Sequence, residues 1–392
     1  RDLFSGSPAA AGLLREGKTV GCFYVESPVM IQMLRQARCE DFETLTALSS
    51  IIRPGVSSYG GKELYLSRHL GLEPAGRICP AVDRVLKNTY GCLIYQEQVI
   101  RLAVEVSGMS YAEADGLRRC MSYKSGDDET MAQYRRPFVR GALERGVPGK
   151  TARMVFDWIA SFSGYAFCKA HSASFAMESL ASVYWKANFP AEFMAAVIAN
   201  GGGYYRTGEY VEEARRMGID MEPPCVNRSS LRTRGGKGRV IIGLSRVKGL
   251  TAAAAESIIK NRPYRSLREF LSRVRISESE TRSLIRCGGM RSLGGSIPRL
   301  LWERRILAAE EVRYSAGNRA ASSPPVAPAL QLKEKVEPGM TLHADDLIGM
   351  LPGLTGRASL ARRVAMEMEV LGFAVSAHPL VAFAGRVSRL RE

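Results

Sequence analysis

The sequence predicts a mainly α-helical protein with minor β content. Apolar residues recur at helical spacing, as at Val99, Leu102, Ala103 and Val106, which would share one face of a helix. Helix-start signals accompany this spacing, whereas the run with clear strand character, Arg239 to Leu244, is short. A chain of 392 residues has room for two or three domains built from such elements.

The first 200 residues predict one helical domain. Val20 to Val25 suggests a short strand or an extended entry. Ser110 and Glu113 have the spacing of a capping box, in which a side-chain oxygen and a carboxylate bind each other's backbone amides at a helix start. Pro190 suits the first turn of another helix, where its missing donor costs little.

The pattern changes after residue 200. Three glycines at 201–203 interrupt the chain, and a helix is expected over Tyr210 to Met217. Four prolines between 324 and 338 stand among Ala, Ser and Lys, which is typical of a linker. The expected divisions are 1–200, a region over 201–313 whose last part holds two compact helical units, a linker over 314–359 and a helical tail over 360–392.

Composition points to a polyanionic partner. Lys and Arg total 55 against 39 Asp and Glu, a net charge of +16. The eight cysteines contain no C-x-x-C pair, which indicates reduced thiols of a cytoplasmic protein rather than zinc ligands or disulfides. No apolar run is long enough to span a membrane. The chain starts with Arg, so we expect it to be part of a longer protein.

The segment from Ser163 to Phe175 carries the most chemistry. It combines a glycine, aromatic residues including Tyr165, the cation of Lys169 and the imidazole of His171 in one short connection between apolar helices. A lone histidine is more often a surface or core residue than a working one. Beside a lysine and a tyrosine, however, it suits a flat, charged ligand such as a nucleotide.

Gly12 to Thr19 matches a phosphate-binding loop in spacing but not in context. Gly12 to Thr19 has the spacing of a P-loop, which needs a buried strand before it and a helix after it so that backbone amides converge on phosphate. Here a stretch of small residues precedes the motif, and an extended segment is expected to follow it.

Several blocks resemble the family C of bacterial DNA polymerases, to which the replicative DNA polymerase III alpha subunits belong. The Ser163 to Phe175 segment is similar to the fingers of that family, and five further blocks agree in order. They are Gly21 to Ser27, Ile52 to Gly55, Thr89 to Gln98, Ala114 to Arg119 and Tyr184 to Phe193. The resemblance implies a polymerase fingers domain over 1–200 and, after 360–392, an oligonucleotide-binding barrel that this chain does not include.

The resemblance also implies a clamp for an incoming deoxynucleoside triphosphate. Arg118 and Arg119 match the family's fingers arginines, and Lys124 lies just beyond them. Guanidinium groups pair with phosphate oxygens through two parallel hydrogen bonds, which suits this task. The structural alternative is that these cations only complement the dipole at a helix C-terminus.

Tyr165, Lys169 and His171 would form the wall beside the base and sugar, with His171 near the 2′ position. Many family members carry Ser before this histidine, whereas Ala170 stands here, so a role of that hydroxyl in sugar selection is not carried over. Arg53 would contact template or triphosphate; the alternative is a purely structural role in a turn.

Val247 to Leu250 and the helix after it have the form of a helix-hairpin-helix. Gly249 would let backbone amides approach a DNA phosphate, and the helix starting near Thr251 would direct its positive end at it. Arg246 and Lys248 would add charge. Such contacts bind the phosphate backbone without reading bases. A second, weaker unit is expected over Ser277 to Arg286, a hairpin at 287–290 and a helix from Pro298; the alternative for both is an ordinary helix pair.

The residues expected to perform the chemistry are missing. Polymerases hold two metal ions between closely placed carboxylates. Asp127 and Asp128 lie in a polar turn and Asp345 and Asp346 follow the linker, so neither pair suits this role. The family carries its Mg²⁺ ligands in the palm, upstream of the matched blocks. We therefore expect no catalytic or metal-binding residue here and no activity from this chain alone.

Two function classes remain open. The favoured one is part of a replicative or error-prone DNA polymerase that binds dNTP and template-primer DNA, in a bacterial, nucleoid-associated setting with a sliding clamp and other replisome subunits as possible partners. The alternative is a non-catalytic DNA-binding or scaffold protein. The two differ in whether DNA binding depends on nucleotide.

Overall fold

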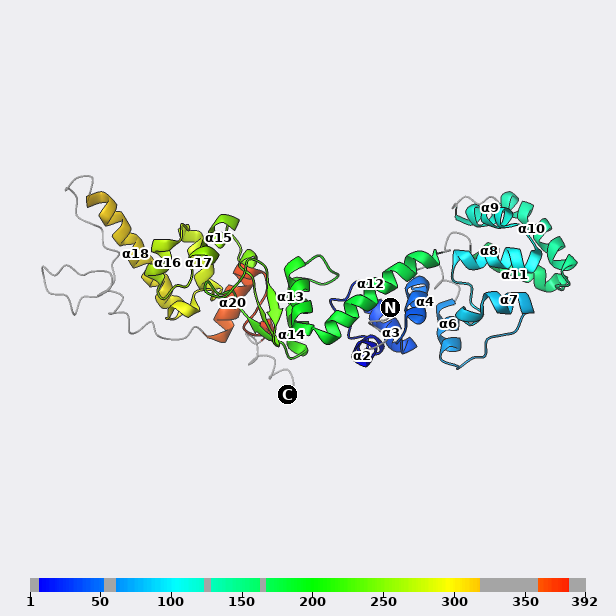
Figure 1. The fold of residues 1–392 in the computed structure, drawn as a ribbon, viewed down its shortest axis with the longest axis horizontal. Helices are drawn as coiled ribbons and strands as arrows, with labels where there is room; N and C mark the ends of the chain where they lie inside the picture. The colour runs from blue at the N-terminus through cyan, green and yellow to red at the C-terminus, as the bar shows by residue number, and fades with distance from the viewer. Residues whose placement is uncertain (1–6, 53–60, 123–127, 163–166, 318–358, 381–392) are drawn as a thin grey trace. The chain divides into compact units, whose positions relative to one another are not determined.

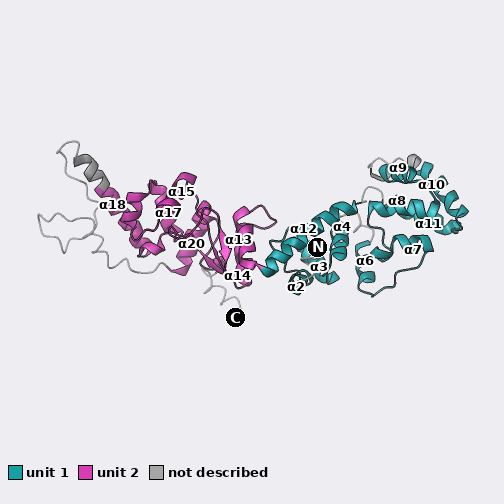
Figure 2. Ribbon diagram, in the orientation of Figure 1, with its two compact units in different colours: residues 1–188 teal, residues 189–392 magenta. Residues whose placement is uncertain are grey.

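The computed structural model describes residues 7–52, 61–122, 128–162, 167–317 and 359–380 (Figure 1). These residues are mostly helical and include one three-stranded sheet, so the mainly α prediction with minor β content is confirmed. The chain divides into two compact units, residues 1–188 and 189–392 (Figure 2). No helix among the described residues is both long and apolar enough to cross a bilayer.

Helices joined by turns and irregular segments make up the described part of the first unit. Its longest helix, α12, packs against α4 and α2, while α8 contacts α7, α9 and α10. The elements are α2 (Pro8–Arg15), α3 (Pro28–Ala37), α4 (Phe42–Ile51), α6 (Gly61–His69), α7 (Pro80–Val85), η1 (Lys87–Thr89), α8 (Gln96–Ser107), α9 (Tyr111–Ser122), α10 (Asp128–Glu144), α11 (Gly149–Ser161) and α12 (Lys169–Asn188).

Local capping chemistry sets several of these boundaries. The Ser110 hydroxyl accepts from the Glu113 N–H at 3.2 Å, and the Glu113 carboxylate accepts from the Ser110 N–H at 2.8 Å. This reciprocal pair is the predicted capping box, and it begins α9. On α8, Val99, Leu102, Ala103 and Val106 are all buried, as their spacing predicted.

The strand or extended entry expected over Val20 to Val25 is wrong. This segment is a series of turns, in which the Cys22 N–H donates to the Thr19 carbonyl at 2.9 Å. The buried ammonium of Lys186 on α12 donates to the Val20 carbonyl at 2.7 Å. Backbone groups of this segment are therefore hydrogen-bonded within a turn and to Lys186, and not to a neighbouring strand.

The rejection of the P-loop is confirmed. Gly12 and the two leucines after it lie inside α2, whose N-cap Ser7 accepts from the Ala10 N–H. A glycine within a helix offers its amide to the helix ladder rather than to phosphate. Lys18 forms an ion pair with Glu16 at 2.7 Å.

The second unit combines the sheet with a helical region. The sheet has the order β1-β3-β2, with β1 parallel and β2 antiparallel to β3. Its elements are α13 (Pro190–Asn200), α14 (Thr207–Arg216), β1 (Asp220–Glu222), β2 (Arg234–Gly236), β3 (Arg239–Ile241), η2 (Leu244–Arg246), α15 (Ala252–Asn261), α16 (Leu267–Arg273), α17 (Glu278–Arg286), η3 (Arg291–Leu293), α18 (Ile297–Gly317) and α20 (Leu360–Leu371).

Helix α13 opens at Pro190, as predicted, and packs against β2 and β3. The approach is close, because a Cβ on Gly235 would lie 2.0 Å from the Ala191 carbonyl oxygen. Helix α13 thus belongs to the second unit, whose boundary falls after residue 188 rather than near 200. The strand predicted from Arg239 and the helix predicted from Tyr210 are both present, as β3 and α14.

Candidate nucleotide and DNA interface

The N-terminus of α8 joins segments that are distant in sequence. Tyr95 pairs with Phe167 in an isolated parallel bridge, and the Gln96 N–H donates to the Phe167 carbonyl at 3.0 Å. The Gln96 side-chain oxygen accepts from the Arg118 guanidinium at 3.3 Å. One glutamine therefore connects an arginine of α9 with the segment that enters α12.

Asp115 holds the two arginines of α9. The Nε atoms of Arg118 and Arg119 donate to different oxygens of its carboxylate, each at 2.8 Å. The hydrogen bond from Arg118, reinforced by the positive charge of both arginines, lowers the pKa of Asp115. The Arg119 side chain is 71% exposed and that of Arg118 only 26%. Arg119 is therefore the more accessible of the two cations.

Glu97 caps the start of α12. Both of its carboxylate oxygens accept from the Lys169 N–H, each at 3.0 Å, and the Cys168 thiol lies 3.5 Å from one of them. The negative charge stands where a helix N-terminus favours it. The first turn of α12, which carries Lys169 and His171, is fixed in this way to the first turn of α8.

The Lys169 ammonium lies among carboxylate and aromatic groups. It is 3.2 Å from a carboxylate oxygen of Glu43 on α4 and 5.5 Å from the ring centre of Tyr95. Burial, together with the nearby Glu43 and Glu97 charges, raises the pKa of Tyr95. The phenol therefore stays neutral, and its ring presents an electron-rich face to the lysine.

His171 is exposed between two phenylalanine rings. Its ring centre lies 5.2 Å from that of Phe167 and 4.2 Å from that of Phe175. One residue later, the buried Ser172 hydroxyl lies 2.7 Å from that of Ser50 on α4. The imidazole is thus held by aromatic packing on a turn that α4 anchors from behind.

The first hairpin of the second unit is tight and exposed. Gly249 has φ +82° and open space where a Cβ would stand, and it lies between the single 3₁₀ turn η2 and α15. The Lys248 N–H donates to the Val370 carbonyl at 3.0 Å, which ties the hairpin to α20, while the Lys248 side chain is exposed. A helix N-terminus behind an exposed glycine turn is suited to an anion.

Glu280 on α17 connects the N-terminal ends of α15 and α17. One of its oxygens accepts from the N–H and the hydroxyl of Thr251, at 2.9 and 2.8 Å. The other accepts from the N–H and the hydroxyl of Ser277, at 2.9 and 2.7 Å. This buried carboxylate therefore caps α15 and α17 at once.

Comparison with known proteins identifies relatives of this chain. Residues 6–146 match the family described as the bacterial DNA polymerase III alpha subunit finger domain, and residues 218–299 match the helix-hairpin-helix motif. The DNA polymerase III subunit alpha of Thermus aquaticus is 33% identical over 96% of the chain. By sequence, the chain is a relative of the bacterial DNA polymerase III alpha subunits.

Other relatives carry two kinds of name. The DNA polymerase III subunit alpha of Aquifex aeolicus is 30% identical over 95% of the chain, and the error-prone DNA polymerase of Teredinibacter turnerae is 34% identical over 79%. The chain spans about 30% of the length of these relatives. The chain is thus similar both to DNA polymerase III alpha subunits and to error-prone DNA polymerases.

The structure brings three of the predicted nucleotide residues to the α8 junction. Arg118 contacts it through Gln96, Lys169 through Glu97 and Tyr95, and His171 through Phe167, while Arg119 follows Arg118 through their shared Asp115. Lys124, Tyr165 and Arg53 lie outside the described residues. None of these contacts tests nucleotide binding, so the roles stay predictions.

The predicted DNA residues differ in how much they are already engaged. Arg246 donates to the Ile198 carbonyl, and burial lowers the pKa of its guanidinium. Thr251 has its N–H and hydroxyl bound to Glu280. Lys248 and Gly249 are exposed, so they are the more accessible candidates in this hairpin.

Three residues of the site carried no predicted role. Tyr95, Gln96 and Glu97 form the junction, whereas the sequence distinguishes them only as part of the Thr89 to Gln98 block. The dense run of Gln and Glu at the start of an apolar helix was the available signal.

The described residues offer no fit for the Mg²⁺ that polymerases of this family use. They contain no group of three or more His, Cys, Asp or Glu side chains placed to hold a metal. Strand β1 alternates Asp220 and Glu222, but Glu222 is paired with Arg228 at 2.6 Å and Arg239 at 3.2 Å. A carboxylate committed to two guanidinium groups is poorly placed to bind a metal.

Proposed function

We propose that this chain supplies the nucleotide-binding and DNA-binding parts of a bacterial DNA-directed DNA polymerase, a nucleotidyltransferase. One observation carries the proposal: Gln96 joins Arg118 to the segment that bears Lys169 and His171. Cations and ring-bearing side chains from separate helices thereby gather at one junction within the first unit. That combination suits a ligand with several phosphates and a base.

Each group would act on a different part of the incoming dNTP. Arg119 and Arg118 would pair with phosphate oxygens and exchange part of their bonding to Asp115 for the triphosphate. Lys169 would likewise exchange Glu43 for phosphate. His171, held by Phe167 and Phe175, would border the sugar, and Lys124 and Tyr165 would complete the clamp and the wall.

The hairpins would hold the template-primer duplex by its backbone. Lys248 and the Gly249 turn would contact phosphate, with Arg246 and Thr251 supporting the turn from within and Arg53 contacting template from the first unit. These contacts would depend on duplex shape and charge and not on base sequence. A cytoplasmic, nucleoid-associated setting and contact with the sliding clamp and other replisome subunits belong to the same proposal.

Catalysis itself would need carboxylates from elsewhere in the polymerase. Because the described residues do not fit Mg²⁺, we expect the 392-residue chain to incorporate no nucleotide in a primer-extension assay with Mg²⁺. Metal-dependent incorporation by the purified chain would show that a carboxylate site has been misassigned.

Nucleotide-dependent DNA binding tests the central claim. The measurement is the affinity for a fluorescent primer-template by anisotropy, with and without the dNTP that pairs with the next template base. A correct dNTP should tighten binding, and Arg118→Ala or Arg119→Ala should remove roughly tenfold of this effect, as loss of a charge-assisted hydrogen bond would. Arg140→Ala is the matched control, because Arg140 is 79% exposed and its Nε lies 3.9 Å from Glu144.

The alternative function is a non-catalytic DNA-binding or scaffold protein. It is favoured by the hairpin region, which is complete in the described residues, whereas a carboxylate cluster is not found among them. A scaffold would bind the duplex equally well with and without dNTP, and the arginine variants would then behave like Arg140→Ala. That outcome would replace the polymerase proposal.

A further inference from the structure

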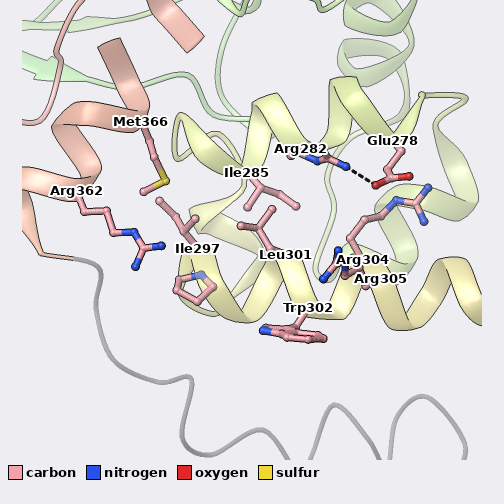
Figure 3. A pocket seen from close by; sticks show the side chains of 11 residues that line it. Glu278, Arg282, Ile285, Ile297, Leu301, Trp302, Arg304, Arg305, Arg362 and Met366 are labelled. Carbon is pink, nitrogen blue, oxygen red and sulfur yellow. Dashed lines mark hydrogen bonds and ion pairs between the residues drawn. The ribbon is translucent and has the colours of Figure 1, made fainter. Parts of the chain in front are cut away.

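A pocket in the second unit is lined by α17, α18 and α20 and has a volume of about 380 Å³ (Figure 3). Its central wall is apolar, formed by Ile285, Ile297, Leu301 and Met366. None of the residues assigned above to nucleotide or DNA lines it. The pocket is therefore a separate feature of the helical region.

The pocket has a strong positive charge. Four arginines line it against a single carboxylate, Glu278, which is paired with Arg282 at 2.6 Å. The lining as a whole therefore carries more positive than negative charge, with Arg305 and Arg362 on different helices. An occupant of this pocket has to supply negative charge, because like charges placed together repel.

The charges stand at two ends of the pocket. In Figure 3, Arg362 lies beside Met366 at one end, Arg304 and Arg305 lie at the other, and Leu301 lies between them. A complementary ligand would therefore carry an apolar group in its middle and anionic groups on both sides. A segment with one large apolar side chain flanked by carboxylates has this pattern.

The pocket wall favours a peptide over a nucleic acid strand. Bases bind to single-strand sites by stacking on aromatic rings. Trp302 is the aromatic residue of this lining, and the Arg305 guanidinium lies over its ring at 5.5 Å. The other apolar residues of the lining are aliphatic or Met, and methionine adapts to side chains of different shape. Arg, Met and aromatic residues are also enriched in protein interfaces.

We propose that this pocket binds a short acidic segment of a partner protein, with one Leu, Ile or Phe on the apolar wall and Asp or Glu toward the arginines. The apolar side chain would supply most of the affinity, since removing a large apolar group from water is favourable. The carboxylates would select against neutral and basic segments. This proposal does not depend on the chain's role in DNA synthesis.

Labelled synthetic peptides test the proposal on the full chain. The probes are fluorescent hexapeptides with a central Leu, Ile or Phe flanked on both sides by Asp or Glu, and each has a twin with Asn or Gln in place of the acids. Binding is measured by anisotropy at about 0.1 M salt, which screens long-range attraction. At least one acidic peptide should bind about tenfold or more tightly than its amide twin.

Variants separate the pocket from general charge. Arg305→Glu with Arg362→Glu should weaken binding by about tenfold or more. Arg265→Glu with Arg275→Glu changes the net charge equally at exposed arginines outside the pocket and should have little effect. Met366→Lys adds positive charge but blocks the apolar wall, so binding should weaken, where attraction by charge alone would strengthen it. Circular dichroism melts check that each variant is folded.

Several results would overturn the proposal. Equal binding of acidic peptides and amide twins, or no binding of either, would remove the selectivity on which it depends. Equal loss in the two double variants would reduce the effect to net charge. Displacement of the peptide by oligothymidylate, with loss of oligothymidylate binding in Arg305→Glu with Arg362→Glu but not in the control pair, would assign the pocket to nucleic acid. If Met366→Lys does not fold, the two double variants still decide.

Discussion

Gln96 is the residue on which the candidate nucleotide site depends most directly. Gln96→Ala would remove the acceptor for Arg118 and keep the backbone bond to the Phe167 carbonyl, so the fold should persist while the guanidinium loses a restraint. We expect the dNTP-dependent gain in primer-template affinity to fall about fivefold, as for the loss of one intramolecular hydrogen bond worth about 1 kcal/mol. Anisotropy titrations measure this.

The control for Gln96 is an exposed glutamine on another helix. Gln133→Ala on α10 should leave the nucleotide effect unchanged. If Gln96→Ala also leaves the nucleotide effect unchanged, the contact between Gln96 and Arg118 does not contribute to nucleotide binding. The proposed function then loses its main support.

The same residue shows where sequence reasoning ends. Arg118 and Lys169 could be selected from the sequence because their charge and local neighbours are visible there. Gln96 could not be assigned a role, because its partners Phe167 and Arg118 are brought to it by helix packing. A long-range contact leaves no periodic signal in a single sequence.

At the scale of elements, a single carboxylate holds two helix starts together. Glu280→Gln replaces a fourfold acceptor with an amide that has one accepting oxygen, so either Thr251 or Ser277 loses a partner. We expect a loss of about 1–3 kcal/mol in the free energy of unfolding, measured by urea denaturation at pH 7. The control is Glu278→Gln, two residues earlier in α17, where the side chain is 58% exposed. This substitution should lower the free energy of unfolding by about 0.5 kcal/mol or less.

The pH dependence distinguishes this carboxylate from a packing effect. Burial alone would favour the neutral acid, but the hydrogen bonds from Thr251 and Ser277 outweigh it and lower the pKa of Glu280 to about 2. Its stabilisation is therefore complete above the ordinary value of 4.5 and is lost as the pH falls toward 2. The gap between wild type and Glu280→Gln should narrow between pH 5 and pH 2.5 or so; a constant gap would assign the loss to packing.

Several helices could be predicted from the sequence because short-range signals determine where they begin and which face is buried. The capping box at Ser110, the proline at 190 and the apolar spacing of α8 each predicted a helix that is present. The strand prediction for Val20 to Val25 was wrong because Lys186, which is distant in sequence, supplies a hydrogen-bond donor that the local pattern does not reveal. The bridge made by Glu280 could not be predicted either. The spacing of Ser277 and Glu280 indicates a capping box, but no local pattern indicates that Glu280 also binds Thr251.

At the scale of the whole molecule, the net charge of +16 should make duplex binding strongly dependent on salt. Each phosphate contact releases condensed counterions, so the logarithm of the binding constant falls linearly with the logarithm of salt concentration. Lys248→Ala should reduce the steepness of that line by roughly one unit, because it removes one contact at the exposed Gly249 turn. Lys260→Ala is the matched control: it removes the same charge from the opposite end of α15. Equal slopes for the two variants would show that the basic surface acts only as a diffuse field, and the hairpin would then have no specific phosphate contact.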